Sequence, residues 1–413
     1  MERMLSSRKL NFAAGGLPGF YLGTFLSAAW SMIIPTIPTL GREFGVSAGG
    51  AAQIVTAFAV GKFLGQMIGG VVIDRMGTRI ALISGPLIAS IGSFLAVIAP
   101  GFIAILVLTG IMGAMDSIWG SAREVGVIDL AQQHQRGRVL SSIHGTYSIG
   151  VAVCPFLGGW LTDLFGFKAA FVGYGLAALA SVPLGFSATG SLLTQVSRQR
   201  SDEGMGWRLA PRRRLRKVLA LFQEIRPDFR PTYYALVLAT LVNQSQRIII
   251  QSMLPLYAGA YLQLSSTEIG LLFSISGVIV FAMIIPAGFV MDRVGRKWCT
   301  VPSTAIPALV FVLIPMTRSF FQLAILVGFA GISQGLALGS VATSTYDIVP
   351  AHVRARLQAA RRTVAELGSG LAPLFGGYLA NAYGPGVPFL VYAPLLVFSA
   401  ALLAIVGKET LER

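Results

Sequence analysis

Residues 70–79 read Gly-Val-Val-Ile-Asp-Arg-Met-Gly-Thr-Arg, and residues 288–297 read Gly-Phe-Val-Met-Asp-Arg-Val-Gly-Arg-Lys. The two stretches share an aspartate, an arginine and a glycine at the same places, so that Asp74 and Asp292 lie 218 positions apart. Each stretch is a short charged segment between two long apolar runs. The chain therefore carries a candidate internal repeat.

The same offset relates several other positions. Pro155 corresponds to Pro373 and Asp129 to Asp347, and the offset also aligns Arg136 with Arg354 and Arg138 with Arg356. Agreement at so many positions without a gap indicates one apolar unit that has been duplicated. Duplicated membrane halves that meet around a site at mid-membrane are the common plan of secondary transporters.

The composition indicates a membrane protein. Hydrophobic residues make up 54% and charged residues 12% of the chain, whereas a soluble domain has about 25% charged residues. Apolar stretches of spanning length recur along the chain, and only helices satisfy the backbone of such segments in lipid. We predict an all-α integral membrane protein with twelve spans, at 17–38, 50–73, 79–99, 102–128, 140–163, 168–188, 233–260, 266–290, 299–317, 320–343, 357–381 and 386–406.

The net charge of +15 admits nucleic-acid binding as one interpretation, but the positions of the charges favour a topology signal. With the N-terminus in the cytoplasm, 24 of the 32 Lys and Arg residues fall on the cytoplasmic side and five within helices. Only Arg42, Lys168 and Arg318 fall on the other side. This bias predicts an inner-membrane protein with both termini cytoplasmic and no nucleic-acid partner.

The predicted domains follow from the single long hydrophilic stretch. Residues 1–188 form a first six-helix bundle, 189–230 a cytoplasmic basic linker, and 231–413 a second six-helix bundle. Within the linker, residues 211–226 have the spacing of a basic amphipathic helix, which would lie on the inner leaflet or be a solvated connector. Cys154 and Cys299 lie in or next to apolar segments of different halves and predict neither a disulfide nor a metal site.

The repeated loop resembles the signature loop of the major facilitator superfamily. The pattern Gly-x-x-x-Asp-Arg-x-Gly-x-Arg lies between the second and third predicted helices and again between the eighth and ninth. The resemblance covers essentially the whole chain and is nearest to the compact twelve-helix group of drug/proton antiporters. It implies two six-helix bundles around a central cavity, lined by the first, fourth, seventh and tenth helices, which rock to open the cavity to alternate sides.

The resemblance also implies a gate. In the family, the aspartate matching Asp74 meets the positive N-terminal end of a helix from the other half and holds the cytoplasmic side closed. The gating candidates are Asp74, Arg75, Arg79, Asp129, Asp292, Arg293, Arg296 and Asp347. Thr78 stands where a basic residue is common, so Asp129 would use Arg75 or Arg79. The alternative is that these charges only set the topology.

A second motif lies in the fifth predicted helix and resembles the motif associated with antiporters of the superfamily. Small residues beside a proline bend a helix and permit close helix packing. The residues of the two copies are Gly150, Pro155, Gly158 and Gly159, and Pro373, Gly376 and Gly377. Because the motif is repeated, it indicates general packing as much as export. Thr109 stands where efflux members often carry an arginine.

Ionisable residues buried in membrane helices are costly and are functional candidates. At about 1.5 Å per residue, Lys62, Asp116 and Glu366 lie roughly 15–20 Å from cytoplasmic markers, near mid-membrane. Lys62 and Asp116 lie at matching depth on neighbouring helices, and Arg362 and Glu366 share one helical face, so each pair is positioned to form an ion pair. Asp116, Lys62, Glu366 and Glu124 are the proton-coupling candidates.

The seventh predicted helix is the most polar. Arg247 suits a carboxylate or phosphate in a cavity, or alternatively an acid of the protein itself. The substrate-binding candidates are Arg247, Gln244, Asn243 and Gln251, with Trp30 and Ser27 on the first helix and Arg123 on the fourth. For His144, at the start of the fifth helix, a structural role is favoured over proton transfer.

These features favour a secondary transporter over an enzyme, an ATP-driven pump or a sensor. The three histidines have no metal spacing, and no phosphate-binding glycine loop occurs, so no cofactor or metal is expected. We predict proton-coupled efflux of a small molecule by a monomer in the lipid bilayer, driven by the proton gradient. The alternative is uptake or exchange of a small organic anion, favoured by Lys62, Arg123 and Arg247.

Overall fold

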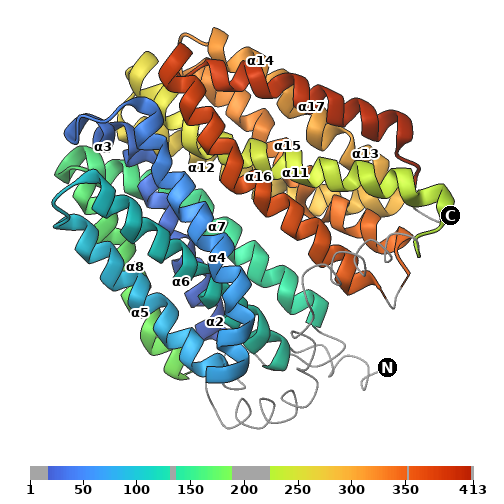
Figure 1. Cartoon of the computed structure of the whole chain (residues 1–413), viewed down its shortest axis with the longest axis horizontal. Coiled ribbons are helices and arrows are strands. Elements are labelled where there is room, and N and C mark those ends of the chain that lie inside the picture. Colours follow the sequence, from blue (N-terminus) through green and yellow to red (C-terminus); the bar gives the residue numbers. More distant parts are fainter. Residues whose placement is uncertain (1–16, 131–135, 188–223, 351–352, 411–413) are drawn as a thin grey trace, which may run out of the picture.

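A computed structural model describes residues 17–130, 136–187, 224–350 and 353–410. The described chain is helical throughout and forms two bundles, one in blue to green and one in yellow to red (Figure 1). The predicted amphipathic helix of the linker, at 211–226, lies almost wholly outside the described residues.

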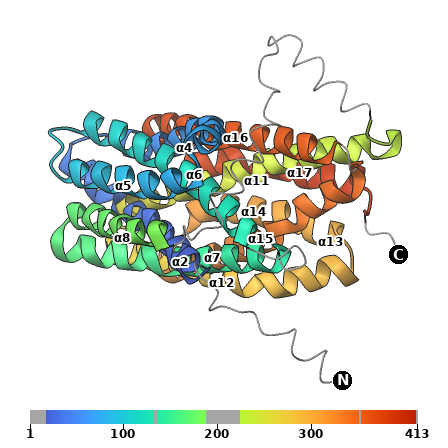
Figure 2. The ribbon, with the colours of Figure 1, turned by 90° about the horizontal axis from the view of Figure 1, so that it is seen from below.

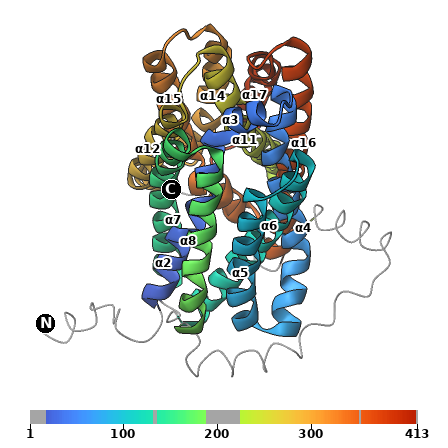
Figure 3. The same ribbon diagram turned by 90° about the vertical axis from the view of Figure 1, so that its left-hand side faces the viewer.

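The first bundle has six crossings. The first crossing is built from three consecutive helical pieces, α2 (Leu17–Ser27), the 3₁₀ helix η2 (Ala28–Thr36) and α3 (Ile37–Glu43). The other five are α4 (Ala48–Met76), α5 (Thr78–Val97), α6 (Phe102–Leu130), α7 (Arg136–Phe165) and α8 (Phe167–Ser187). Figure 3 shows this bundle lengthwise, with α3 at the end opposite the start of α2.

The second bundle repeats the plan. Its first crossing comprises η3 (Pro227–Phe229), α11 (Arg230–Leu256) and η4 (Tyr257–Tyr261), and its second is α12 (Ser266–Arg293). The third comprises α13 (Lys297–Thr300), α14 (Pro302–Leu313) and η5 (Ile314–Met316). The last three are α15 (Phe320–Ile348), α16 (Arg354–Tyr383) and α17 (Val387–Val406). The twelve predicted spans are thus present within a few residues of their expected bounds. Ten of the crossings in the described residues are long and apolar enough to span a membrane; α11 and α16 are the polar exceptions.

The repeated glycine of the signature loop has a conformational role. Gly77 ends α4 with φ of 87°, and the matching Gly295 follows α12 with φ of 146°. L-residues with a side chain rarely adopt such angles, so glycine allows the chain to turn sharply into the next helix. We call the end of the molecule that carries Asp74 and Asp292 the motif end, and the opposite end the far end.

Two helix pairs join the bundles. Figure 2 shows α4 beside α16 on one side of the molecule and α7 beside α12 on the opposite side, and both pairs are in contact. Near the far end, buried residues of both halves merge into one apolar cluster that includes Ile37, Ala51, Tyr257 and Ile269. The bundles are therefore packed together at the far end. Large apolar side chains such as Ile285, Phe321 and Ile405 are exposed on the outside, as expected for a surface that faces lipid.

Candidate functional site: a cavity between the two halves

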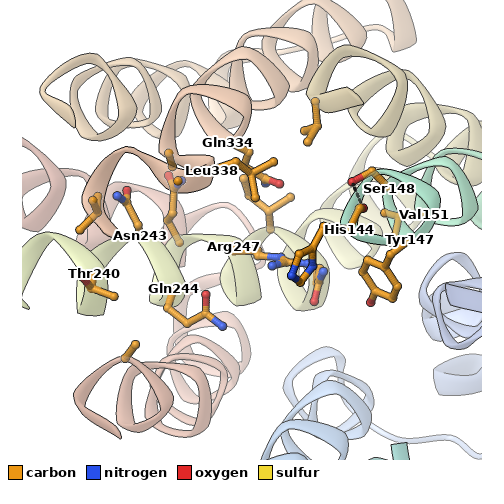
Figure 4. Close-up of a pocket in the computed structure, with 18 of the residues that line it drawn as sticks. His144, Tyr147, Ser148, Val151, Thr240, Asn243, Gln244, Arg247, Gln334 and Leu338 are labelled. Carbon is orange, nitrogen blue, oxygen red and sulfur yellow. Dashed lines mark hydrogen bonds between the residues drawn. The ribbon is translucent and has the colours of Figure 1, made fainter. Parts of the chain in front are cut away.

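A cavity of about 520 Å³ lies between the bundles, in the size range of small-molecule sites. The first half contributes Gln66 of α4 and one face of α7, including His144, Tyr147 and Ser148 (Figure 4). The second half contributes the rest of the lining, from α11, α12, α15 and α16. Gln66, His144 and the lining residues of α16 lie from mid-helix towards the motif end, whereas Phe273 and Val327 lie nearer the far end. The cavity therefore extends from the middle of the interface towards the motif end.

The polar face of α11 lines the cavity, as predicted. Asn243, Gln244, Arg247 and Gln251 all contribute, and Figure 4 shows the first three around the cavity. Among the described residues, Arg247 has no hydrogen-bond or ion-pair partner, so the alternative of an internal salt bridge is not realised here. A half-exposed guanidinium is left facing the cavity.

The helix α16 adds two more guanidinium groups. Arg361 is only 6% exposed; its Nε and one terminal nitrogen donate to the Gln358 amide oxygen at 3.0 and 2.8 Å. Its other terminal nitrogen donates to Thr240 Oγ1 at 2.8 Å. Arg362 is exposed and Glu366 half-buried, both line the cavity, and the structure does not pair them within the described residues. The expected Arg362–Glu366 ion pair is therefore absent in this conformation.

The predicted Lys62–Asp116 pair is present. Lys62 Nζ lies 2.9 Å from Asp116 Oδ2, and the Asp116 side chain is 10% exposed against 40% for Lys62. Lys62 also lies 5.6 Å from the centre of the Phe58 ring. Tyr147 and Arg247 are within electrostatic range of the Lys62 ammonium, which places the pair next to the cavity. Depth along two neighbouring helices was thus sufficient to predict this contact.

Three substrate-binding candidates lie outside the cavity lining. Trp30 stacks on Phe58 with ring centres 3.5 Å apart, and the Ser27 hydroxyl donates to the Thr24 carbonyl at 2.7 Å. Arg123 is 8% exposed, donates to the Gly23 carbonyl at 2.8 Å, and lies over the Trp119 ring. In this conformation the three side chains make contacts within the first half, and their role in substrate binding stays a prediction. Glu124, a proton-coupling candidate, is exposed on α6 outside the cavity.

At the far end, side chains of each half cap a helix of the other. Asp163 near the end of α7 accepts hydrogen bonds from the backbone N–H groups of Ser266 and Thr267 at 3.0 and 2.7 Å, and from the Thr267 hydroxyl at 2.5 Å. Asn381 near the end of α16 accepts one from the Gly49 N–H of α4 at 2.7 Å. Asp163 and Asn381 are related by the 218-residue offset of the repeat. We call these two contacts the far-end latches.

The repeated glycine–proline motif packs the same two interfaces. A methyl group at Gly159 would collide with the Ser266 backbone of α12, and Gly377 approaches the Gly49 backbone of α4. Gly150, Gly158 and Gly376 approach the first crossing of their own half, at Ala28, Met32 and Ile249 respectively. Both α7 and α16 continue through Pro155 and Pro373. The motif therefore provides close helix packing at the far end, the packing role predicted for it.

At the motif end, the second copy of the signature loop forms a charge cluster. Arg296 binds Asp292 at 2.8 Å and Asp347 at 3.1 Å, and Asp347 also accepts from Thr410 at 3.2 Å. Partial burial acts to lower the pKa of Arg296, but its bonds to the two carboxylates outweigh this, so the pKa is raised and the guanidinium stays charged. Arg293 instead lies over the Phe289 ring.

The first copy of the loop is arranged differently. Asp74, Arg75 and Arg79 are exposed, and Asp74 has no ion-pair or hydrogen-bond partner among the described residues. The Asp129 side chain lies outside the described residues. By the repeat offset, Thr78 stands where the second half has Arg296, so the first half has no arginine at that position. The gating role of Asp74 stays a prediction.

The cavity offers binding groups but no catalytic cluster. Within the described residues no group of three or more His, Cys, Asp or Glu is placed to hold a metal, and Cys154 and Cys299 are buried free thiols. Sequence reasoning missed Asp163 and Asn381 as functional candidates. Their shared repeat position was the available signal, because two polar residues at matching helix ends suggest matching contacts.

Comparison with known proteins identifies the family. The family model described as Major Facilitator Superfamily matches residues 20–229 and 236–412. The chain belongs to this superfamily, whose members are transporters rather than enzymes. It is 23% identical over 390 residues to the multidrug resistance protein MdtG of Salmonella paratyphi A (strain ATCC 9150 / SARB42), and the match covers 92% of each chain.

Solved structures share the fold. A D-xylose–proton symporter matches with a TM-score of 0.74 at 16% identity, covering 95% of this chain and 98% of the other. A POT family transporter in complex with 5-aminolevulinic acid matches with a TM-score of 0.77 at 12% identity, covering 97% and 99%. At these identities the likeness concerns the fold alone, two six-helix halves around a central cavity.

Proposed function

We propose that this transporter exports a small organic molecule from the cytoplasm in exchange for protons. The observation that carries the proposal is the Lys62–Asp116 pair, whose nearly buried carboxylate lies midway along α6 beside the cavity. A charged side chain at that position in a membrane helix is energetically costly, so we expect it to have a function. The direction is supported by likeness to a relative named for multidrug resistance.

In this scheme the motif end faces the cytoplasm, because most Lys and Arg residues of the connecting segments fall on that side. The observed conformation is then inward-facing, since the halves are latched at the far end and the cavity lies towards the motif end. Substrate would enter from the cytoplasm in this state. One chain holds both halves and the cavity, so we propose a monomer as the working unit.

Orientation has its own test. Single cysteines at Ser201 and Ser265 are placed on a background without Cys154 and Cys299. Ser265 is exposed at the far end, whereas Ser201 lies in the linker, outside the described residues. An impermeant thiol reagent applied to intact cells should label only the Ser265 position. Labelling of Ser201 from outside contradicts the orientation and the twelve-span topology.

The proton step follows from the ion pair. While Lys62 neutralises it, Asp116 stays ionised. When α4 and α6 shift during the transition to the outward-facing state, separation of the pair leaves a carboxylate in an apolar site, where the neutral acid is favoured. Asp116 would thus take a proton from outside and release it inward when Lys62 returns. Each cycle would carry a proton in and a substrate molecule out.

The deciding experiment uses purified protein in liposomes and a ligand found by thermal-shift screening. Proton antiport predicts that an acidic lumen drives ligand accumulation inside the vesicle, whichever way the protein is inserted. The second candidate function is uptake of a small organic anion with protons, which is favoured by the three arginines of the cavity. This second function predicts ligand accumulation only when the vesicle lumen is alkaline. Accumulation under that condition therefore rejects export in exchange for protons.

A further inference from the structure

The charge of the cavity wall points to the class of substrate. Arg247, Arg361 and Arg362 line the cavity together with one described carboxylate, that of Glu366. None of the three guanidinium groups forms an ion pair with a described residue. A cavity between low-dielectric walls with an excess of fixed positive charge repels cations and attracts anions. The excess comes from two neighbouring helices, α11 and α16, so it is concentrated on one wall.

Arg361 is the most informative of the three. Its side chain is almost completely buried, and arginines are rarely buried without a compensating acid. Its described partners are neutral oxygens, those of Gln358 and Thr240, which satisfy hydrogen bonds but leave the charge uncompensated. Gln358 is itself fixed, because its amide donates to the Ala342 carbonyl of α15 at 3.1 Å. The guanidinium is therefore held in place with its charge free for a ligand.

The hydrogen-bond count supports the same conclusion. A guanidinium has five N–H donors, and the three hydrogen bonds of Arg361 to Gln358 and Thr240 use one donor on Nε and one on each terminal nitrogen. Two donors remain without a described partner, and Arg361 is one of the residues that line the cavity. Arg362, next in sequence, is exposed to the cavity and is not neutralised by Glu366 one turn away. A carboxylate or phosphate group matches such a paired, planar donor set.

The other residues of the cavity lining indicate the chemistry of the rest of the ligand. Gln244 and Gln334 offer neutral hydrogen-bonding groups, and Ile250, Phe273 and Val327 offer apolar surface. Specific small-molecule sites combine mostly apolar walls with a few fixed polar groups. We infer that the transported substrates are small organic anions whose carboxylate or phosphate group binds Arg361 and Arg362, with Arg247 of α11 as a further charge contact. The inference rests on the proposed function only in that the cavity holds the substrate.

Equilibrium binding tests the inference. Thermal unfolding of the purified full chain is measured with benzoate and phenyl phosphate and with their neutral partners, benzamide and benzyl alcohol, at constant ionic strength. The anions should stabilise the protein at millimolar concentration, and the neutral partners should not. Arg362→Gln should weaken anion binding roughly tenfold, the usual effect of losing a charge-assisted hydrogen bond. Arg318→Gln, at an exposed far-end arginine, is the matched control and should bind as the wild type does.

Arg361→Gln should weaken anion binding at least as much as Arg362→Gln. If it fails to fold, the exposed Arg362 still decides the matter, because its loss leaves no buried donor unpaired. The inference is overturned if anions and neutral partners bind equally, if no anion stabilises the protein, or if the foldable arginine variants bind anions unchanged. The measurement needs neither a gradient nor a direction, so its failure leaves proton-coupled export standing, and failure of export leaves the anion site standing.

Discussion

At the scale of single residues, the ion pair and the cavity arginines lie in different halves, and we propose different functions for them. Asp116 has a charged partner at 2.9 Å within its own half, whereas Arg361 has only neutral described partners in the other half. A carboxylate that can exchange its charged partner for a proton suits the coupling of transport to the proton gradient. A fixed cation without a counter-ion suits binding. We therefore expect substitutions at the two sites to separate coupling from binding.

The first prediction concerns coupling. Asp116→Asn keeps the shape of the side chain and removes its charge, so the site can no longer load a proton. Accumulation driven by a pH gradient should fall to the background level, while exchange of labelled for unlabelled substrate across the same vesicles should remain largely intact. Glu43→Gln, an exposed far-end carboxylate, is the control for charge removal alone. Full pH-driven transport in Asp116→Asn would move the proton site elsewhere, with Glu366 next to be tested.

Sequence reasoning succeeded at this scale where depth alone decides a contact. Lys62 and Asp116 were predictable because both lie deep on adjacent helices and have few other partners. Arg362 and Glu366 were not, since spacing of four residues permits an ion pair worth only about 0.3–0.5 kcal/mol and the open cavity competes for both side chains. Trp30 and Ser27 lie outside the cavity lining in this conformation, and their role in substrate binding stays a prediction.

At the scale of helices, the far-end latches and the break in α15 stand out. Each latch places a side chain of one half at the positive N-terminal end of a helix in the other. The two are repeat-related, but the Asp163 latch carries a charge and three accepted hydrogen bonds, whereas the Asn381 latch is neutral with one. The pair α7–α12 is thus fastened more firmly than α4–α16 at this end.

The second prediction tests the stronger latch. Asp163→Ala removes a charged helix cap, worth about 1 kcal/mol and up to about 2 when partly buried, and should shift the population away from the observed conformation by roughly five- to thirtyfold. A cysteine at Gln334, in the cavity lining, should then react more slowly with a thiol reagent applied from the motif end. The reactivity is measured on the background without Cys154 and Cys299.

The control for this latch lies in the same helix turn. Glu268 closes a capping box with Ser265 inside α12, and Glu268→Ala costs a cap of similar strength without touching the other half. It should lower the thermal stability but leave the reactivity at position 334 unchanged. Equal effects of the two variants would show that Asp163 only stabilises the start of α12.

The third prediction concerns the break in α15. Leu338 and Gly339 have non-helical angles and line the cavity, and Gly339 has φ of 87°. Alanine in that conformation costs about 1–2 kcal/mol, so Gly339→Ala should lower the free energy of unfolding by that amount and slow transport. Gly288→Ala is the control: it lies in α12 with nothing near its added methyl group, so it should be neutral or slightly stabilising. A thermally unaffected Gly339→Ala would mean that the break is not required.

The same break marks a limit of prediction from sequence. The stretch 320–348 reads as an uninterrupted apolar helix without proline, and nothing in its pattern distinguishes Gly339 from the glycines at 331 and 335 that stay helical. The long periodic spans were predictable because hydropathy and length determine them. A break within one of them depends on tertiary packing and the cavity beside it, which a local pattern does not contain.

At the scale of the whole molecule, the described residues of the two halves are latched together at the far end and form no such latch at the motif end. The far end has two caps across the interface and a shared apolar cluster, whereas the motif end has the cavity and an Asp74 without a described partner. Rocking of the bundles would close the motif end and open the far end. A transporter that alternates in this way needs both latches to be weak, so that neither state is a trap.

The fourth prediction therefore concerns the opposite latch. If Asp74 meets a helix N-terminus of the other half when the motif end closes, Asp74→Asn removes about 0.3–1 kcal/mol, up to about 2 when partly buried, from the closed state alone. The free energy of the observed conformation should not change, because Asp74 is exposed there. The cysteine at Gln334 should react faster from the motif end, the reverse of Asp163→Ala, and transport should slow because the motif end closes less often. Asp228→Asn, an exposed carboxylate before α11, controls for lost charge.

Since the two latches are at opposite ends and share no partner, their effects should add, and the double variant should return the reactivity towards that of the wild type. If Asp74→Asn leaves both reactivity and transport unchanged, the signature loop of the first half sets topology and does not gate.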